Sequence, residues 1–196
     1  MGKEGGRAFV SLEDFVIHAY LRFVRTDRIT LAPQLLTELL AIGTDEQVYG
    51  LVDALPPLLR HGRLVLLPIF ITSEQDEAPH WLLACIDPRA RAVLYLDSFE
   101  SECDERTAQL GMLCQALAMC DPAWEGTAAE PWGRWRDGVP QQSNKTDCGV
   151  FVMEYVRLLA AGTQPERTAA RTQRAWKGGA LRRRMTLELL QWWHLV

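Results

Sequence analysis

An abrupt change of character at Cys148 constrains the fold of this chain more than any other feature. The seven residues before it, 141–147, include no apolar side chain. The residues after it carry apolar side chains around most of a helical circumference, as far as Gly162. This pattern predicts a helix that is packed on most sides and ends in a glycine C-cap. A chain with such a helix must surround it with other elements.

Cys148 stands in the first turn of this predicted helix. The free backbone N–H groups and the positive end of the peptide dipoles at that position favour a thiolate and can hold a developing oxyanion. These are the requirements of a cysteine nucleophile. Considered alone, a buried cysteine is more often a small apolar core residue, so the choice between the two interpretations depends on its neighbours.

Length and charge limit the function classes. The 196 residues, 48% of them hydrophobic, suit a single domain over residues 1–196. A net charge of −4 argues against nucleic-acid binding that relies on overall basicity. The one basic cluster, Arg182–Arg184, lies in a helical pattern, and we interpret it as a solvated helix face.

The cysteines and the hydropathy profile bear on cofactors and location. The five cysteines do not have zinc-ligand spacing, so we expect no metal, no organic cofactor and reduced thiols. The start of the chain lacks an apolar signal core, and no apolar run reaches the roughly 18 residues of a membrane span. We therefore expect a monomer without membrane association, in the nucleus or cytoplasm, or in a host cell if it is a bacterial effector.

Apolar periodicity predicts several helices. We expect helices over residues 12–24, 30–42 and 45–55, the first capped by Ser11 and the third closed by Pro56 and Pro57. Residues 105–120 and 179–195 show helical patterns later in the chain, and residues 121–137 are loop-rich with room for one short strand.

Three apolar runs of strand length lie between these helical segments. The first, residues 64–71, contains Pro68, which predicts a bulge or a sheet edge there. The runs 80–87 and 92–97 are joined by the turn composition of residues 88–91 and predict an antiparallel hairpin. Because the start of one strand and the end of the other then meet at one sheet edge, His80 and Asp97 should be neighbours.

A thiol, an imidazole and a carboxylate form a complementary set. His80 would take the thiol proton of Cys148, and Asp97 would fix the imidazole tautomer and stabilise its positive form. Gln141 and Gln142 offer side-chain amides that could join the Cys148 N–H in an oxyanion hole. Taken singly, each residue also has an ordinary interpretation: a structural histidine, a turn former and two polar loop residues.

Several motifs together resemble the Ulp1/SENP-type cysteine proteases, which act on ubiquitin-like modifiers. His80-Trp81 opens the hairpin, Leu96-Asp97-Ser98 closes it, and the nucleophile loop reads Gln141-Gln142-Ser-Asn-Lys-Thr-Asp147-Cys148-Gly149. The chain order His, Asp, Cys also matches that family. The resemblance extends to residues 16–20, 67–69 and 182–190.

The resemblance implies an α+β, papain-like (Ulp1/adenain-type) fold, with a central, mostly antiparallel sheet flanked by helices. It implies Cys148 as nucleophile, His80 as general base, Asp97 as the residue that orients it and Gln142 as oxyanion donor. Trp81 would cover a tunnel for the C-terminal Gly-Gly of SUMO, NEDD8 or ubiquitin, and the enzyme would process that modifier or remove it from conjugates. The family's second tunnel tryptophan has no counterpart, because its place reads Ser11-Leu-Glu-Asp14.

Two alternatives of other classes remain open. YopJ-type acetyltransferases use a similar His, acid and Cys set, usually with Glu as the acid. A module that binds a ubiquitin-like protein without cutting it is the second alternative. Asp97 and the Gln-Gln-Ser-Asn loop favour the protease over the acetyltransferase, and the complete triad argues against a pure binding module.

Overall fold

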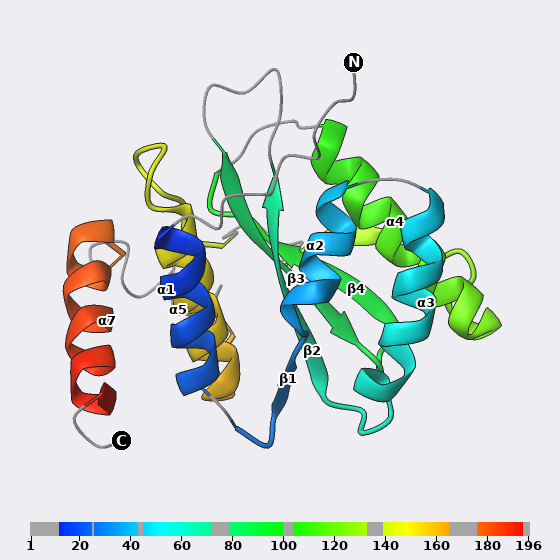
Figure 1. Ribbon diagram of the computed structural model, residues 1–196, viewed down its shortest axis with the longest axis horizontal. Coiled ribbons are helices and arrows are strands. Elements are labelled where there is room, and N and C mark those ends of the chain that lie inside the picture. The colour runs from blue at the N-terminus through cyan, green and yellow to red at the C-terminus, as the bar shows by residue number, and fades with distance from the viewer. Residues whose placement is uncertain are drawn as a thin grey trace, which may run out of the picture.

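A central five-stranded sheet organises the protein, a computed structural model that describes residues 12–24, 26–42, 45–71, 79–99, 104–132, 139–164 and 176–193 (Figure 1). The strands lie in chain order: β1 (Ile29–Leu31), β2 (Leu64–Ile71), β3 (His80–Asp87), β4 (Ala92–Leu96) and β5 (Ala129–Pro131). The three long central strands pair antiparallel, whereas short β1 and β5 pair parallel at the two edges. The expected α+β fold with a helix-flanked sheet is confirmed.

The helices cover both faces of the sheet (Figure 1). One layer contains α1 (Leu12–Phe23), α5 (Cys148–Ala160) and α7 (Gly178–Trp193). The other contains α2 (Gln34–Ile42), α3 (Asp45–Leu59) and α4 (Asp104–Cys120), which is followed by the 3-10 turn η1 (Pro122–Trp124). Within the described segments, no helix is long and apolar enough to cross a bilayer.

Each face of the sheet has its own hydrophobic core because strand residues alternate between the faces. In β2, Leu66 packs with α1, α5 and α7, while Val65, Leu67 and Ile69 pack with α2, α3 and α4. Cys148 belongs to the first of these cores. The predicted helix behind it is confirmed as α5, and Gly162 follows it with φ 76°, the left-handed conformation that a glycine C-cap uses.

The predicted antiparallel hairpin is confirmed. β3 and β4 pair from Leu83 with Leu96 to Asp87 with Ala92. Asp97 follows the last residue of β4, and His80 is the first residue of β3. Both side chains therefore lie at one edge of the sheet, as the sequence predicts.

The prediction that the second helix, residues 30–42, begins at Thr30 is wrong. Thr30 and Leu31 belong to strand β1, and α2 starts at Gln34. The reason is Pro33, because proline disfavours the helical conformation in the residue before it. Its carbonyl then accepts the Leu36 N–H at 3.0 Å and opens the helix. Ser11, the expected cap of the first helix, lies outside the described residues.

The predicted end of the third helix is also wrong, since α3 continues through Pro56 and Pro57 to Leu59. A proline in a helix leaves the carbonyl four residues earlier without its N–H donor. For Pro56 that carbonyl belongs to Val52, and the Cys120 thiol donates to it at 3.4 Å. A side chain of α4 thus replaces one of the lost hydrogen bonds.

Pro68 lies in β2 opposite Leu83 of β3 and makes no bulge; on its other side, the described part of the chain contributes no paired strand. Pairing between β2 and β3 runs without interruption from Val65 to Ile71. On the other side of β2, pairing with β1 stops at Leu66. β2 therefore has a neighbouring strand on both sides at its start, but by Pro68 it is an edge strand. A proline, which has no N–H to donate, is tolerated in an edge strand.

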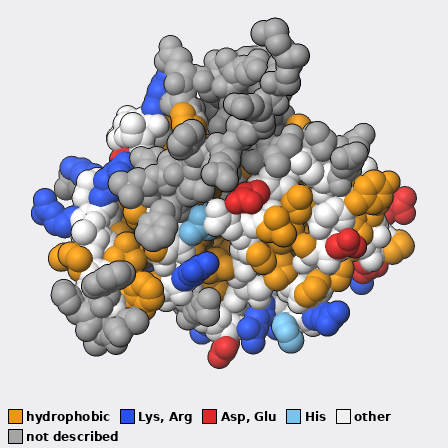
Figure 2. Space-filling view, in the orientation of Figure 1, with side chains coloured by type: hydrophobic (Ala, Val, Ile, Leu, Met, Phe, Trp, Pro, Cys, Tyr) orange, Lys and Arg blue, Asp and Glu red, His pale blue; other side chains and the backbone are white. Residues whose placement is uncertain are grey.

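The interpretation of Arg182–Arg184 as a solvated helix face holds for Arg182 and Arg183, which are exposed, but it is incomplete. Lys and Arg side chains do gather at the start of α7 (Figure 2). However, Arg182 forms an ion pair with Asp147, and Arg184 forms one with Glu154, and both carboxylates are buried. Of the three arginines, Arg182 and Arg184 therefore connect α7 to the start and the middle of α5.

Candidate active site

Asp97 is the most firmly held side chain of the predicted set. Its Oδ1 accepts hydrogen bonds from His80 Nε2 at 2.7 Å and from the Phe99 N–H at 2.9 Å. Its Oδ2 accepts one from Arg106 Nη1 at 2.7 Å. Burial opposes ionisation, but these donors and the charge of His80 together lower the pKa of Asp97. The site therefore contains a buried, ionised carboxylate.

His80 bridges the carboxylate and the thiol. Its Nε2 lies 2.7 Å from Asp97 Oδ1, and the Cys148 side chain lies close enough to raise the pKa of the imidazole. Burial by itself would lower the pKa of His80, but the hydrogen bonds and charges of Asp97 and Cys148 raise it to about 9. The imidazole is thus positively charged at neutral pH. The three residues predicted from the sequence are brought together in one connected series.

Cys148 is the first residue of α5 and is only 6% exposed. The N-terminal end of α5 packs closely against α1 and β3. A Cβ added to Gly149 would stand 2.7 Å from Ile17 Cδ1 and 3.7 Å from Trp81 Cδ1. A side chain at this position would therefore require the end of the Ile17 side chain to shift, whereas its distance from Trp81 is an ordinary van der Waals contact.

The glutamine loop docks directly on the segment that contains Asp97. Gln141 Nε2 donates to the Asp97 carbonyl at 2.9 Å, and the Gln142 N–H donates to the Ser98 carbonyl at 2.8 Å. Ser98 Oγ donates to Gln142 Oε1 at 2.7 Å, which turns the amide nitrogen of Gln142 away from Ser98. That nitrogen donates one hydrogen bond to the Asn144 carbonyl at 2.5 Å and carries a second N–H.

Trp81 lies beside the start of α5 and is only 4% exposed. Its ring contacts Phe70 at a centroid distance of 4.9 Å and His18 at 6.4 Å. Its Nε1 is buried and has no hydrogen-bond partner among the residues that the structure describes. The side chains of residues 11–14, where the resemblance would place a second tryptophan, lie outside the described part.

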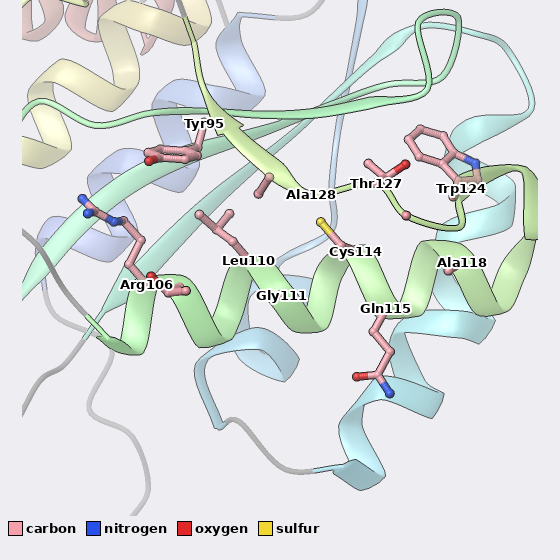
Figure 3. A pocket seen from close by; sticks show the side chains of 13 residues that line it. Tyr95, Arg106, Leu110, Gly111, Cys114, Gln115, Ala118, Trp124, Thr127 and Ala128 are labelled. Atoms are coloured by element: carbon pink, nitrogen blue, oxygen red, sulfur yellow. The ribbon is translucent and has the colours of Figure 1, made fainter. Parts of the chain in front are cut away.

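Arg106 is a site residue that sequence reasoning missed. It lies on α4, beside Asp97, with its guanidinium 5.6 Å from the centre of the Tyr95 ring. Figure 3 shows Arg106 beside Tyr95 at one end of a cavity of about 470 Å³, with Trp124 at the other end. In the sequence, Arg106 is a single arginine near the start of a predicted helix, and it belongs to no motif that would identify it as a site residue.

Comparison with known proteins assigns the family. The Ulp1 protease family, C-terminal catalytic domain, matches residues 53–187, more than half of the chain. The chain therefore belongs to the Ulp1 protease family, which is a family of cysteine peptidases.

Curated relatives match over shorter segments. The ubiquitin-like-specific protease ESD4 of Arabidopsis thaliana is 34% identical over 90 residues, which is 42% of this chain and 17% of that protein. The human Sentrin-specific protease 3 is 30% identical over 98 residues, 50% of this chain and 16% of that protein. This chain thus spans only about a sixth of the length of these relatives.

Solved structures share the fold. The C-terminal Ulp1 protease domain in complex with Smt3, the yeast ortholog of SUMO, superimposes with a TM-score of 0.56 and 18% identity. The similarity covers 88% of this chain and 76% of that one. The SUMO protease Ulp1 with its catalytic cysteine oxidised to a sulfonic acid gives a TM-score of 0.60 at 17% identity, covering 88% of this chain and 78% of that one.

Proposed function

We propose that this chain hydrolyses the peptide or isopeptide bond after the C-terminal Gly-Gly of a ubiquitin-like modifier, through a thioester on Cys148. The observation that carries the proposal is the connected series of Asp97, His80 and Cys148. Membership of a cysteine peptidase family supports the reaction class. SUMO is the first candidate modifier, because several solved neighbours are SUMO proteases.

Acylation begins with His80 protonated and Cys148 as its thiolate partner. The sulfur attacks the carbonyl carbon of the terminal glycine, and a C–S bond forms as the carbonyl becomes an oxyanion. The Cys148 N–H and the second N–H of Gln142 Nε2 hold this oxyanion. The intermediate collapses by breaking the C–N bond, and His80 gives its proton to the leaving amine.

Deacylation uses the same groups in reverse. Neutral His80 takes a proton from water, and the resulting hydroxide attacks the thioester carbonyl. The second oxyanion collapses by breaking the C–S bond, which returns the thiolate beside a protonated imidazole. Asp97, held by Arg106 and the Phe99 N–H, keeps the same imidazole edge turned to Cys148 in both halves.

Trp81 is the residue that we assign to the substrate tail. It lies beside Gly149 and therefore one residue from the nucleophile. Glycine residues in the tail would let the substrate backbone pass close to this ring, where a side chain would collide.

The test is covalent capture by electrophilic modifiers. SUMO, NEDD8 and ubiquitin carrying a C-terminal vinyl sulfone are each incubated with the protein, and adducts are located by peptide mass spectrometry. We expect one modifier, SUMO first, to attach to Cys148 and a Cys148→Ala variant to remain unlabelled. Labelling at another cysteine would contradict the assigned nucleophile.

The same preparation distinguishes the two alternative functions. Acetylation of Cys148 by acetyl-CoA, without capture by any modifier, would indicate an acyltransferase. Tight binding of an unmodified modifier without adduct formation would indicate a binding module. The family match supports proteolysis over both.

A further inference from the structure

The carboxylate next to the nucleophile is turned away from the helix that it precedes. Asp147 is the N-cap residue of α5, since its carbonyl accepts the Phe151 N–H at 3.0 Å. An aspartate at this position ordinarily accepts hydrogen bonds from the N–H groups of the first turn. Within the described part of the chain, the Asp147 side chain makes no such capping bond. Something else must therefore hold it.

Arg182 of α7 holds one oxygen of this carboxylate. Its Nε and Nη2 both donate to Asp147 Oδ1, at 2.9 and 2.7 Å. The same Nη2 also donates to the Thr146 carbonyl at 2.6 Å. The Asp147 side chain is only 9% exposed, whereas that of Arg182 is 46% exposed. A half-exposed arginine from a distant helix thus grips a buried carboxylate and the peptide group just before it.

Asn144 holds the other oxygen. Its Nδ2 donates to Asp147 Oδ2 at 2.8 Å, and its own Oδ1 accepts the Asp147 N–H at 3.0 Å. Gly178, the first residue of α7, closes the cradle, because a Cβ added there would stand 1.6 Å from Asp147 Oδ2. Backbone and side chains from two parts of the chain therefore fit this one carboxylate closely.

The unused capping position is the place where the proposed chemistry happens. The N–H groups of the first turn and the positive end of the helix dipole are the features that stabilise a thiolate and an oxyanion. A carboxylate that turned back to cap this helix would occupy those donors and repel both anions. Because Arg182 and Asn144 hold the Asp147 carboxylate away from α5, the N–H groups of the first turn stay available.

We propose that Arg182 is a positioning residue for Cys148: it keeps the Asp147 carboxylate off the first turn of α5, so that this turn serves the thiolate and the oxyanion alone. This inference rests on the proposed function, because it assumes that Cys148 is the nucleophile. It assigns part of the catalytic power to α7, which touches neither the base nor the substrate tail in the proposed mechanism.

A matched pair of variants tests the inference. Arg182→Met removes the ion pair but keeps an apolar stem, and Arg183→Met removes the same charge from the next, exposed residue of α7. We expect Arg182→Met to lower kcat about tenfold with KM changed less than twofold. It should also slow alkylation of Cys148 by iodoacetamide several-fold. Arg183→Met should behave as the wild type.

A second substitution separates repulsion from simple loss of structure. If the freed carboxylate is the cause of the defect, adding Asp147→Asn to Arg182→Met should restore at least half of the lost alkylation rate, because an amide carries no charge. If the clamp only stabilises the loop, the double variant will be as slow as Arg182→Met or slower. That result would overturn the inference.

The readouts keep the inference separate from the proposed function. Thermal unfolding followed by circular dichroism identifies a variant that does not fold, and Arg182→Lys, with an expected two- to threefold loss, then carries the comparison. If the wild type is active and Arg182→Met and Arg183→Met have equal kcat and equal alkylation rates, Arg182 does not position Cys148. The proposed protease function would not be affected by that result. If the wild type captures no modifier, the proposed protease function is contradicted. The alkylation rates would still decide whether Arg182 positions Cys148.

Discussion

The two halves of the site are held by different means. The acid–base half is built from neighbouring segments, with His80, Asp97 and Arg106 within one hairpin and the helix after it, and Asp97 is 8% exposed. The nucleophile half is a loop whose residues 143–146 are exposed, and its main anchor, Arg182, comes from 35 residues beyond Asp147. One half is local in sequence and centred on a buried carboxylate. The other is anchored from a remote helix, and its loop is exposed around a buried thiol.

This difference predicts how each half responds to change. Electrostatic interactions are strong where water is excluded and weak where salt and water can screen them. Loss of the Asp97 charge in the buried half should therefore cost more than loss of any anchor of the loop. The bonds from Gln141 to the Asp97 carbonyl and from Ser98 to Gln142 connect the halves, so effects at that junction should be intermediate.

The largest effect is expected at the centre of the buried half. Asp97→Asn keeps the shape of the side chain but removes the charge that stabilises the imidazolium. We expect kcat to fall by about a thousandfold or more. Steady-state hydrolysis of a modifier with a C-terminal fluorogenic group measures it. A loss of less than tenfold would show that the buried carboxylate does not govern the imidazole.

An intermediate effect is expected at the junction. Gln142→Ala should lower kcat by about a hundredfold with little change in KM, because an oxyanion donor acts in the transition state. Gln141→Ala is the matched control, since it removes one docking bond and no assigned donor. It should cost only a few-fold. Equal losses in the two variants would mean that Gln142 serves only to dock the loop.

A smaller effect is expected for the residue that supports Asp97. Arg106→Met removes a donor that lowers the pKa of the Asp97 carboxyl, so this carboxyl should take up a proton at higher pH than in the wild type. Activity at neutral pH should fall about tenfold, and the acid limb of kcat/KM against pH should move upward. An unchanged acid limb would contradict the role of Arg106.

The smallest catalytic effect is expected where the loop meets α5. The buried Tyr155 hydroxyl donates to the Pro140 carbonyl at 2.7 Å, just before the glutamines. Tyr155→Phe leaves that carbonyl without its donor and should lower the free energy of unfolding by about 1–2 kcal/mol. Urea denaturation measures this, and kcat should change less than threefold. A large loss of kcat would show that this loop anchor matters for catalysis as much as the buried half does.

The acid–base half was also the more predictable from sequence. Alternating strand runs and a four-residue turn fix the pairing of a hairpin, so the meeting of His80 and Asp97 follows from local patterns. The nucleophile helix is equally visible, because its apolar circumference and its terminal glycine need no partner to be recognised.

Apart from the start of α2, which Pro33 sets locally, the misses depend on partners distant in sequence. α3 passes through Pro56 because the Cys120 thiol, 68 residues away, reaches the Val52 carbonyl. β1 is a strand of three residues that forms only against β2. Arg106 and Arg182 acquire their roles from carboxylates on other elements, so neither forms a motif.

The central claim is that Asp97, His80 and Cys148 act as one charged unit, and the pH dependence of Cys148 alkylation tests it without a substrate. Peptide mass spectrometry would follow the rate with anionic iodoacetate relative to that with neutral iodoacetamide. Because the pKa of His80 is raised to about 9, the imidazolium should attract iodoacetate below that pH, and the ratio of rates should fall as the pH rises through about 9. In Asp97→Asn the fall should move to lower pH. A ratio that stays constant from about pH 7 to about pH 10 would contradict the coupling of imidazole and thiol.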